Sequence, residues 1–504
     1  MSTPSSPTCE ALYPVGLMWF RRDLRLGDNP ALHQALTQCR TVHCVFVLDT
    51  DILDPLPRAD RRVEFIQASL VELDQALRLH AQRPAAGLIV LHGKAAQHIP
   101  ELAASLGAQA VFAAHDYEPQ ALARDDQIQA LLAAQGIPLR TCKDHVVFEK
   151  REVLTRTGTV YGVFSPYKKA WIARLTEHPL VVRDMPQMSA LIAKGLADRP
   201  PALQKPPPSL ADIGFKTTNL SQLSIPTGES GARQLFEDFL DRMDAYQDAR
   251  DFPALRGPSY LSVHLRFGTV SIRQLVLSAW QRSLQSSAGA STWLGELIWR
   301  DFYAQILANA PQVCTQSFKP EFDAIQWEQG DLALERFEAW KNGQTGYPLV
   351  DAAMLQLKQS GYMHNRLRMV AGSFLVKDLG VDWRWGECYF AEQLNDFELS
   401  SNNGGWQWVS SSGCDAQPWF RIFNPITQSE KFDAQGKFIK RYLPHLANLS
   451  SRWIHAPWLT PPLELQAAGL KLGKDGHYPM PIVQHDQARD ATLKRYAVVK
   501  KPQI

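Results

Sequence analysis

The chain has 504 residues, of which 45% are hydrophobic and 21% charged, and 53 Lys and Arg against 51 Asp and Glu leave a formal net charge of +2. Such a length exceeds one ordinary core and predicts several domains, while the balanced charge excludes a uniformly basic tail that binds nucleic acid. Seven cysteines without a CxxC pair argue against a disulfide scaffold or a zinc finger, and no metal site is expected. No apolar run approaches the roughly 20 residues that span a bilayer, and the N-terminus lacks a signal-peptide pattern. We therefore expect a cytoplasmic protein without a membrane partner.

The first part of the chain alternates between strand-like and helical patterns. Short apolar runs at 16–20, 41–48, 86–93 and 108–115 are separated by helical stretches such as 61–80 and 119–135. This alternation predicts a doubly wound parallel α/β domain over residues 13–147. The first strand is followed by RRDLRLGDNP and not by GxGxxG, so the phosphate-binding turn of a dinucleotide fold is missing.

The second part of the chain has a different character. Residues 148–226 contain RPPALQKPPPS (199–209), whose proline density is typical of a linker between domains. From 227 to 500 the period is helical, as in Leu235, Phe236, Phe239, Leu240 and Met243, and again in Leu349–Leu357. Twelve of the fourteen tryptophans lie after residue 270. We predict an all-helical C-terminal domain.

Two helical segments carry unusual side chains for a core. In TWLGELIWRDFY (292–303), Glu296 lies between tryptophans, and its alternative reading is a surface ion pair with Arg300, four residues on. In GYMHNRLRMVAGSF (361–374), Asn365, Arg368, Met369 and a glycine share one face, which suits a flat polar ring.

Two further segments suggest a bound nucleotide or sugar. QLNDFELSSNNGGWQWVSSSG (393–413) combines acceptors, amides, glycines and indoles, which match either an isoalloxazine edge or a carbohydrate. YQDARDFPALRGPSYLS (246–262) places hydroxyls before a helix, where phosphate is often held, although an ordinary capped turn has the same pattern.

Together these motifs resemble the photolyase/cryptochrome family, and most of all the bacterial class I cyclobutane pyrimidine dimer (CPD) photolyases. The resemblance begins at WFRRDLRLGDNPAL (19–32) and ELIWRDFY (296–303). It becomes dense through TGYPLVDAAM (345–354), MHNRLRM (363–369), NNGGWQW (402–408) and FRIFNP (420–425). It implies an α/β antenna domain joined by a long linker to a helical domain that binds FAD, and light-driven electron donation from the reduced flavin to a dimer flipped out of DNA.

The resemblance also implies site residues. Flavin contacts would fall on Tyr246, Ser259, Leu261, Ser262, Trp293, Arg300, Asn365, Arg368, Asp396, Phe397, Glu398 and Asn402. The dimer would meet Glu296, Trp299, Asn365, Met369 and Trp408, and the DNA backbone would meet Arg250, Arg366, Arg421 and Gln428. Electrons would reach an oxidised flavin through Trp406, Trp383 and Trp327. The chain departs from the family pattern at Pro258, where Thr is usual, and at Glu398, where Asp is usual.

The resemblance leaves alternatives inside and outside the family. A (6-4) photolyase usually has two adjacent histidines where this chain has His364-Asn365, and an iron–sulfur branch needs four cysteines where only three follow residue 250. A cryptochrome photoreceptor without repair activity is the main alternative, and a flavin-dependent dark oxidoreductase lacks a nicotinamide signature. We expect a monomer without an obligate protein partner that acts on DNA containing pyrimidine dimers.

The antenna chromophore is left open by the sequence. Relatives that bind folate use an Asn-Glu pair, and alignment by the ARD of FAAHDYEPQALARD (112–125) puts Gln120-Ala121 there. 5,10-Methenyltetrahydrofolate, a deazaflavin, a second flavin or an empty site all remain compatible with this segment.

Overall fold

The computed structural model describes residues 12–499 and divides them into two compact units. The first unit contains the chain up to Val147 with His178–Asp238 and Tyr260–Ser278. The second contains Phe148–Glu177, Phe239–Ser259 and the chain from Ala279 onward. The predicted linker, 148–226, thus contributes to both units, with its first 30 residues in the second. The N-terminal segment considered for a signal peptide lies outside the described residues.

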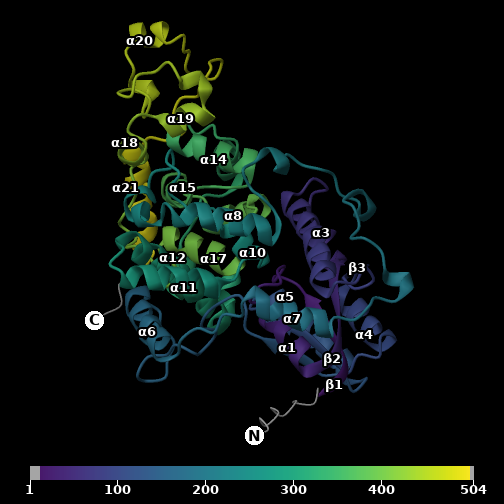
Figure 1. Ribbon diagram of the computed structural model, residues 1–504. Coiled ribbons are helices and arrows are strands. Elements are labelled where there is room, and N and C mark those ends of the chain that lie inside the picture. The colour runs from purple at the N-terminus through teal and green to yellow at the C-terminus, as the bar shows by residue number, and fades with distance from the viewer. Residues whose placement is uncertain (1–11, 500–504) are drawn as a thin grey trace. The chain divides into compact units, whose positions relative to one another are not determined.

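The first unit is built on a parallel five-stranded sheet, seen in Figure 1 in purple and blue. Its strands are β1 (Tyr13–Phe20), β2 (Cys39–Asp49), β3 (Leu88–Gly93), β4 (Ala110–Ala114) and β5 (Leu139–Cys142). The spatial order is β3-β2-β1-β4-β5, and all neighbouring strands run parallel. The predicted α/β fold is confirmed. Strand β5 was not predicted, because only half of its four residues are apolar.

Helices cover both faces of this sheet. They are α1 (Pro30–Gln38), α3 (Arg61–Ala81), α4 (Ala95–Ser105), α5 (Pro119–Ala133) and α7 (Met185–Gly195), with the single turn α2 (Thr50–Leu53). Alternate residues of β1 point to opposite faces: Met18 and Phe20 join the core under α1, α3 and α7, whereas Leu17 and Trp19 join the core under α4 and α5. The strand period of two therefore produces two separate apolar layers.

The segment that replaces the glycine-rich turn is held by buried charges. Arg25 donates to both carboxylate oxygens of Asp144, at 3.0 and 2.5 Å, and Arg273 donates to Asp28 and Asp144 at 2.8 Å each. Asn29 caps α1 by accepting from the Leu32 N–H. The loop after β1 is thus filled by its own side chains, which explains why no phosphate-binding turn is present there.

The second unit is helical, as predicted. Its longer helices are α6 (Phe164–Glu177), α12 (Ala288–Asn309), α13 (Gly330–Lys341), α14 (Pro348–Ser360), α15 (Asn365–Ser373), α16 (Trp383–Gln393), α17 (Leu399–Ser410), α18 (Pro425–Phe432) and α21 (His485–Arg495). The shorter ones are α9 (Tyr246–Ala249), α19 (Lys437–Tyr442) and α20 (Pro462–Ala467). Three helices, α8 (Gly228–Leu240), α10 (Ser262–Phe267) and α11 (Ile272–Leu284), lie in the first unit or across the boundary.

Local sequence explains several helix limits. Helix α8 ends at Leu240, so Met243 lies in the following 3₁₀ turn and not in the helix that the period predicted. Helix α14 begins with Pro348 and ends at Gly361, which adopts the left-handed conformation that glycine tolerates best. Asp301 on α12 accepts hydrogen bonds from the Phe148 N–H and the Trp171 indole, and so fastens residues 148–177 to the helical core.

Within residues 12–499, no helix is long and apolar enough to cross a membrane. The six cysteines of that range are free thiols, while Cys9 lies outside it. The same range contains no cluster of His, Cys, Asp and Glu that fits a metal ion.

Candidate functional site

Helix α12 supplies four of the expected site residues, Trp293, Glu296, Trp299 and Arg300. Ser287 caps the helix by accepting from the Ala290 N–H, and the helix then runs for 22 residues. Trp293 and Arg300 are buried, whereas Glu296 is about one-third exposed. Arg300 Nη2 donates to Glu398 Oε1 at 3.0 Å, and Arg300 Nε lies 3.0 Å from Oε2 in an ion-pair contact that is not a hydrogen bond. Glu398, which replaces the usual Asp, therefore still forms an ion pair with Arg300 that includes one charge-assisted hydrogen bond.

Glu296 does not pair with Arg300, so the alternative of an ion pair within α12 is wrong. Its Oε1 instead accepts from Arg250 Nη1 at 2.6 Å. Arg250 lies at the end of α9, and Arg300 on α12 is paired with Glu398 instead. Glu296, which the resemblance places at the dimer, is therefore paired with Arg250, which the resemblance places at the DNA backbone.

Trp299 lies face to face with an aromatic ring that the sequence did not single out. The ring of Phe164 stacks on the Trp299 indole with centroids 3.7 Å apart and planes 8° apart. Phe302 and Tyr303 contact the same indole at 5.5 and 5.3 Å. One face of Trp299 is therefore covered and the side chain remains half-buried, as expected for the fixed wall of a pocket.

Helix α15 presents the amide and guanidinium that the sequence grouped together. His364 caps it, because its Nδ1 accepts from the Arg366 N–H at 3.2 Å, so this histidine has a structural role. Arg368 Nη2 donates to both carboxylate oxygens of Asp396, at 3.1 and 2.8 Å. Asn365 is exposed, and its amide makes no hydrogen bond within the part of the chain that the structure describes.

Helix α17 carries an asparagine whose orientation is fixed by a residue that the sequence analysis missed. Asn402 Nδ2 donates to the backbone oxygen of Glu387 at 3.1 Å and to its Oε1 at 2.9 Å. Burial raises the pKa of the Glu387 carboxyl, and the bond from Asn402 opposes that rise. The Oδ1 of Asn402 remains available as an acceptor. Only the proximity of Gly386-Glu387 to Trp383 in sequence could have suggested this partner.

Two glycines on α17 have opposite surroundings. A Cβ on Gly404 would collide with the ring of Tyr303, so this glycine allows α12 and α17 to pack closely. A Cβ on Gly405 would meet nothing within 4 Å. Because Gly405 lies one turn from Asn402, open space adjoins the free amide oxygen. The glycine that was expected to admit a ring, Gly372, instead faces the Trp406 indole, with the nearest ring atom 3.5 Å from its Cβ position.

The three tryptophans expected to carry electrons differ in burial. Trp406 and Trp383 are 3% and 1% exposed, and Trp327 is half-buried. Trp406 packs edge-on against Phe390 and Trp340, with centroids 4.9 and 6.1 Å apart. Burial thus decreases from the inner pair, Trp406 and Trp383, to Trp327.

The segment expected to hold phosphate and the flavin rim is split by the unit boundary. Ser259 belongs to the helical unit, whereas Leu261 and Ser262 belong to the first unit. The carbonyls of Gly257 and Pro258 accept from Arg242 Nη1 at 3.4 and 3.2 Å, so Pro258 fits a turn that needs no N–H from it.

Tyr246 lies in an aromatic cluster of the helical unit. Its ring and that of Trp293 contact Phe239, with centroids 5.8 and 4.7 Å apart. Burial raises the pKa of the Tyr246 hydroxyl well above its usual value. Phe397, next to Asp396, is half-buried against the helical core.

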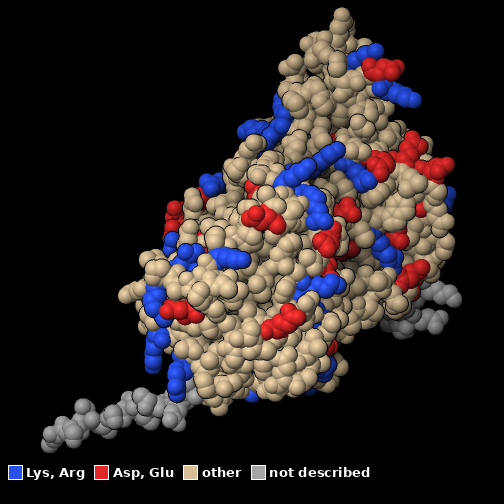
Figure 2. Space-filling view, turned by 90° about the vertical axis from the view of Figure 1, so that its right-hand side faces the viewer, with Lys and Arg blue, Asp and Glu red and all other residues tan. Residues whose placement is uncertain are grey.

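The four residues expected at the DNA backbone are differently engaged. Arg366 Nη2 pairs with Asp251 at 3.0 Å, and its guanidinium lies 4.3 Å from the Phe432 ring centre. Arg421 is exposed, and Gln428 is half-buried with no partner for its Oε1 in the described range. Figure 2 shows one face on which basic and acidic side chains are interspersed, in keeping with the small net charge.

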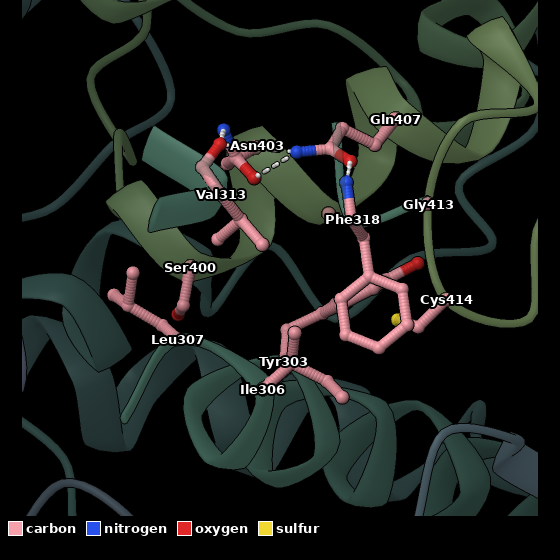
Figure 3. A pocket seen from close by; sticks show the side chains of 11 residues that line it. Tyr303, Ile306, Leu307, Val313, Phe318, Ser400, Asn403, Gln407, Gly413 and Cys414 are labelled. Atoms are coloured by element: carbon pink, nitrogen blue, oxygen red, sulfur yellow. Dashed lines mark hydrogen bonds between the residues drawn. The ribbon is translucent and has the colours of Figure 1, made fainter. Parts of the chain in front are cut away.

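A small cavity lies behind α17, about 10 Å³ in volume, and is shown in Figure 3. Tyr303, Asn403, Gln407 and Cys414 line it, and Gln407 Nε2 donates to Asn403 Oδ1 at 3.1 Å. This volume holds one water molecule at most, so the cavity is no ligand site.

The residues present fit a flavin. Two guanidinium–carboxylate pairs, Arg300–Glu398 and Arg368–Asp396, place fixed charges on α12 and α15. Asn402 adds a free acceptor beside the open space in front of Gly405. A flat ring with alternating donors and acceptors matches this combination, whereas a purely apolar ligand would leave these groups unpaired.

Comparison with known proteins gives consistent matches along the chain. Residues 16–187 match the DNA photolyase family, and residues 293–498 match the FAD binding domain of DNA photolyase. The deoxyribodipyrimidine photo-lyase of Vibrio cholerae is 38% identical over 494 residues, which are 96% of this chain and 99% of that protein.

Solved structures agree with these matches. A bacterial class III photolyase from Agrobacterium tumefaciens is 34% identical with a TM-score of 0.86 over 99% of both chains. An archaeal photolyase from Sulfolobus tokodaii with two FAD molecules is 30% identical with a TM-score of 0.76, covering 96% of this chain and 99% of that one.

Proposed function

The chain belongs to the DNA photolyase family, and on that premise we propose that it repairs cyclobutane pyrimidine dimers in DNA with light, using FAD. The observation that carries the proposal is that one helix, α12, bears the Arg300 guanidinium paired with Glu398, the half-exposed indole of Trp299 and the carboxylate of Glu296. An oxidoreductase acting in the dark would need a second cofactor site, and a light receptor alone would need no such wall.

The flavin would be held by residues of three helices. Arg300 and Arg368, each fixed by a carboxylate, would supply positive charge and planar donors to its polar edges. When bound and reduced, FAD supplies the light-driven electron for the reaction. Asn402 would offer its Oδ1 to a ring N–H, because its Nδ2 is already committed to Glu387. An acceptor in that place favours a protonated ring nitrogen over an unprotonated one.

The dimer would bind between indoles. Trp299, stacked on Phe164, and Trp408 would contact its saturated rings, and Met369 would fill the remaining apolar surface. Asn365 and Glu296 would hydrogen-bond its carbonyl and N–H edge. Because a flipped base must leave the stack, such a pocket gains most from a lesion that is already poorly stacked.

The DNA backbone would meet Arg250, Arg366, Arg421 and Gln428. Two of these arginines are already paired, with Glu296 and Asp251, so phosphates would compete with carboxylates for them. Both pairs are partly buried, with side-chain exposures between 17% and 37%, so each exchange would cost more than at a fully exposed pair. Binding should weaken with salt in proportion to the number of phosphates contacted.

Electrons would enter an oxidised flavin site through Trp406, Trp383 and Trp327. The support for this proposal is the decrease in burial from Trp383 to Trp327, since the outer member of such a chain must exchange electrons with solutes. We further propose that the protein acts as a monomer in the cytoplasm and carries an antenna chromophore, which absorbance and mass measurements of the purified protein would identify.

A repair assay tests the proposal. Holoenzyme with chemically reduced flavin is mixed with an oligonucleotide containing one thymine dimer, and repair is followed by recovery of absorbance of the intact bases. We expect repair under blue light and none in the dark. The variant Trp299→Ala should lose most repair while it retains flavin, whereas Trp280→Phe, outside the proposed site, should behave as wild type. Light-dependent flavin chemistry without any dimer splitting would contradict the proposal and favour a photoreceptor.

A further inference from the structure

Lys377 is a buried lysine outside the residues assigned above. It lies in the π-helical turn Phe374–Asp378, which follows α15, and it is 0% exposed. Lysine is almost never fully buried without partners, and π-helical turns are frequent at functional sites. Its contacts therefore merit a functional explanation.

The ammonium group of Lys377 has three acceptors. Its Nζ donates to Ser411 Oγ at 2.9 Å, to the Arg421 backbone oxygen at 3.1 Å and to the Trp419 backbone oxygen at 3.4 Å. An ammonium has three N–H donors, so all of them are used. The carboxylate of the adjacent residue, Asp378, is bonded to His485 instead, at 2.6 Å.

These acceptors belong to two parts of the proposed site. Ser411 ends α17, the helix of Trp408, with a left-handed φ of 69° that a non-glycine residue adopts at a cost. Trp419 and Arg421 belong to the loop that presents the exposed Arg421 side chain. One buried cation therefore joins the end of the dimer-binding helix to the loop expected at the DNA backbone.

We propose that Lys377 is a positioning residue for DNA binding, whose buried ammonium group fixes the segment 411–421 so that Trp408 and Arg421 engage damaged DNA together. The proposal rests on the function proposed above and deepens it. The alternative, a lysine that only fills the core, would use its methylene chain and would leave its ammonium group in water, as buried lysines commonly do.

The surroundings of Lys377 make this anchor sensitive to pH. Burial lowers the pKa of Lys377 to about 7; Arg421 also lowers it, and Asp378 opposes the change. The other groups that face it are His485, bonded to Asp378, and the Tyr496 ring, 5.9 Å from Nζ. Because the folded-state pKa lies far below the usual 10.5, the ammonium is present below about pH 7 and loses its proton above it. A neutral amine has one donor fewer and no charge, so the segment should loosen as the pH rises.

The test compares two buried substitutions on the same turn. Lys377→Met removes the three donors, whereas Thr492→Val removes the hydrogen bond that Thr492 Oγ donates to the Lys377 backbone oxygen at 2.6 Å and leaves the ammonium contacts intact. Dissociation constants for dimer-containing duplex are measured with holoenzyme from about pH 6 to about pH 8.5. Lys377→Met should bind about 3- to 10-fold more weakly than wild type at the lower pH, where one charge-assisted anchor is lost, and the difference should vanish at the higher pH.

A second readout needs no DNA. Trypsin should cut after Arg421 faster in Lys377→Met than in wild type or Thr492→Val, because the released segment opens more often. If Lys377→Met fails to fold, Lys377→Arg tests the proposal instead. Arginine stays charged over this pH range, so this variant should bind dimer-containing duplex tightly at every pH and should lack the pH dependence of wild type.

Equal dissociation constants and equal cleavage rates for Lys377→Met and wild type would overturn the proposal. A pH profile of Lys377→Arg that follows wild type would do the same. A wild-type holoenzyme that binds no dimer-containing duplex would refute the proposed function instead, and the trypsin comparison would still show whether Lys377 holds the segment.

Discussion

Acid should destabilise the helix that carries Asn365 and Arg368, because His364 caps α15 only while its ring is neutral. His364 Nδ1 accepts from the Arg366 N–H, and a protonated ring has no acceptor there. Burial lowers the pKa of His364 from 6.5 to about 4; Arg366, Arg368 and Arg250 lower it further, and Asp251 opposes them. The folded state therefore binds fewer protons than the unfolded state, and the contribution of His364 to stability, complete above pH 6.5, is lost as the pH falls toward about 4.

The size of this effect follows from the two pKa values. Between pH 7 and pH 5 the linkage relation gives a loss of about 2 kcal/mol for this one group. Other buried groups act in the opposite direction, since burial raises the pKa of Asp351 and of Asp378 to about 6. These carboxyls stabilise the folded state as the pH falls from 6 toward 3.8, so the effect of His364 must be measured as a difference between variants.

The variant His364→Asn isolates the contribution of His364 to the pH dependence of stability, because Asn is a good helix cap that does not titrate. Free energies of unfolding are measured by urea denaturation of the holoenzyme at pH 7 and at pH 5, with hydrogen exchange of the α15 amides as the local probe. Wild type should lose about 2 kcal/mol more than His364→Asn between the two pH values. His364→Ala, which lacks both cap and titration, should be about 1 kcal/mol less stable than His364→Asn at either pH. Equal losses for wild type and His364→Asn would refute the reasoning.

Three other predictions concern the proposed flavin and its surroundings. Asp396→Asn, which removes the charge opposite a flavin-binding arginine, should weaken flavin retention by about tenfold, measured by release of flavin during dialysis. Trp383→Phe should slow photoreduction of oxidised enzyme, followed by flavin absorbance, and leave repair by chemically reduced enzyme unchanged; equal photoreduction would exclude this tryptophan from the route. Gly404→Ala should destabilise the fold by about 1–3 kcal/mol through its clash with an aromatic ring, whereas Gly405→Ala should leave the melting temperature unchanged or higher and should weaken flavin or dimer binding. Normal binding by Gly405→Ala would show that neither ligand uses the space in front of that glycine.

Much of the fold could be predicted because its signals are local. Strands β1 to β4 are continuous apolar runs, as expected for a parallel sheet covered on both faces. Strand β5 (Leu139–Cys142) is too short and too polar to produce such a run. Helix α8 ends before Met243 because a 3₁₀ turn intervenes, and apolar period alone does not distinguish the two.

The sequence predicted which residues would form the site, but it predicted few of the partners that they pair with. Arg368 and Asp396 were both expected at the flavin because of the family resemblance. However, no sequence pattern pointed to the pair that Arg250 forms with Glu296, 46 positions away. Likewise, nothing in the sequence near Trp299 points to Phe164, which lies 135 residues earlier. Such contacts depend on how helices cross, which no short pattern records.

The two glycines that border the Trp406 indole, Gly372 and Gly386, bring the backbones of α15 and α16 close to it. A Cβ added at Gly386 would strike a ring carbon, whereas one added at Gly372 would make an ordinary contact with the ring at 3.5 Å. An oxidised indole is normally stabilised when nearby polar groups reorient toward its positive charge. Close packing of backbone against the ring restricts that reorientation. The proposed relay would therefore begin at a site whose energy is set in advance by the fold, and a single carbon added at Gly386 would change that energy without replacing the tryptophan itself.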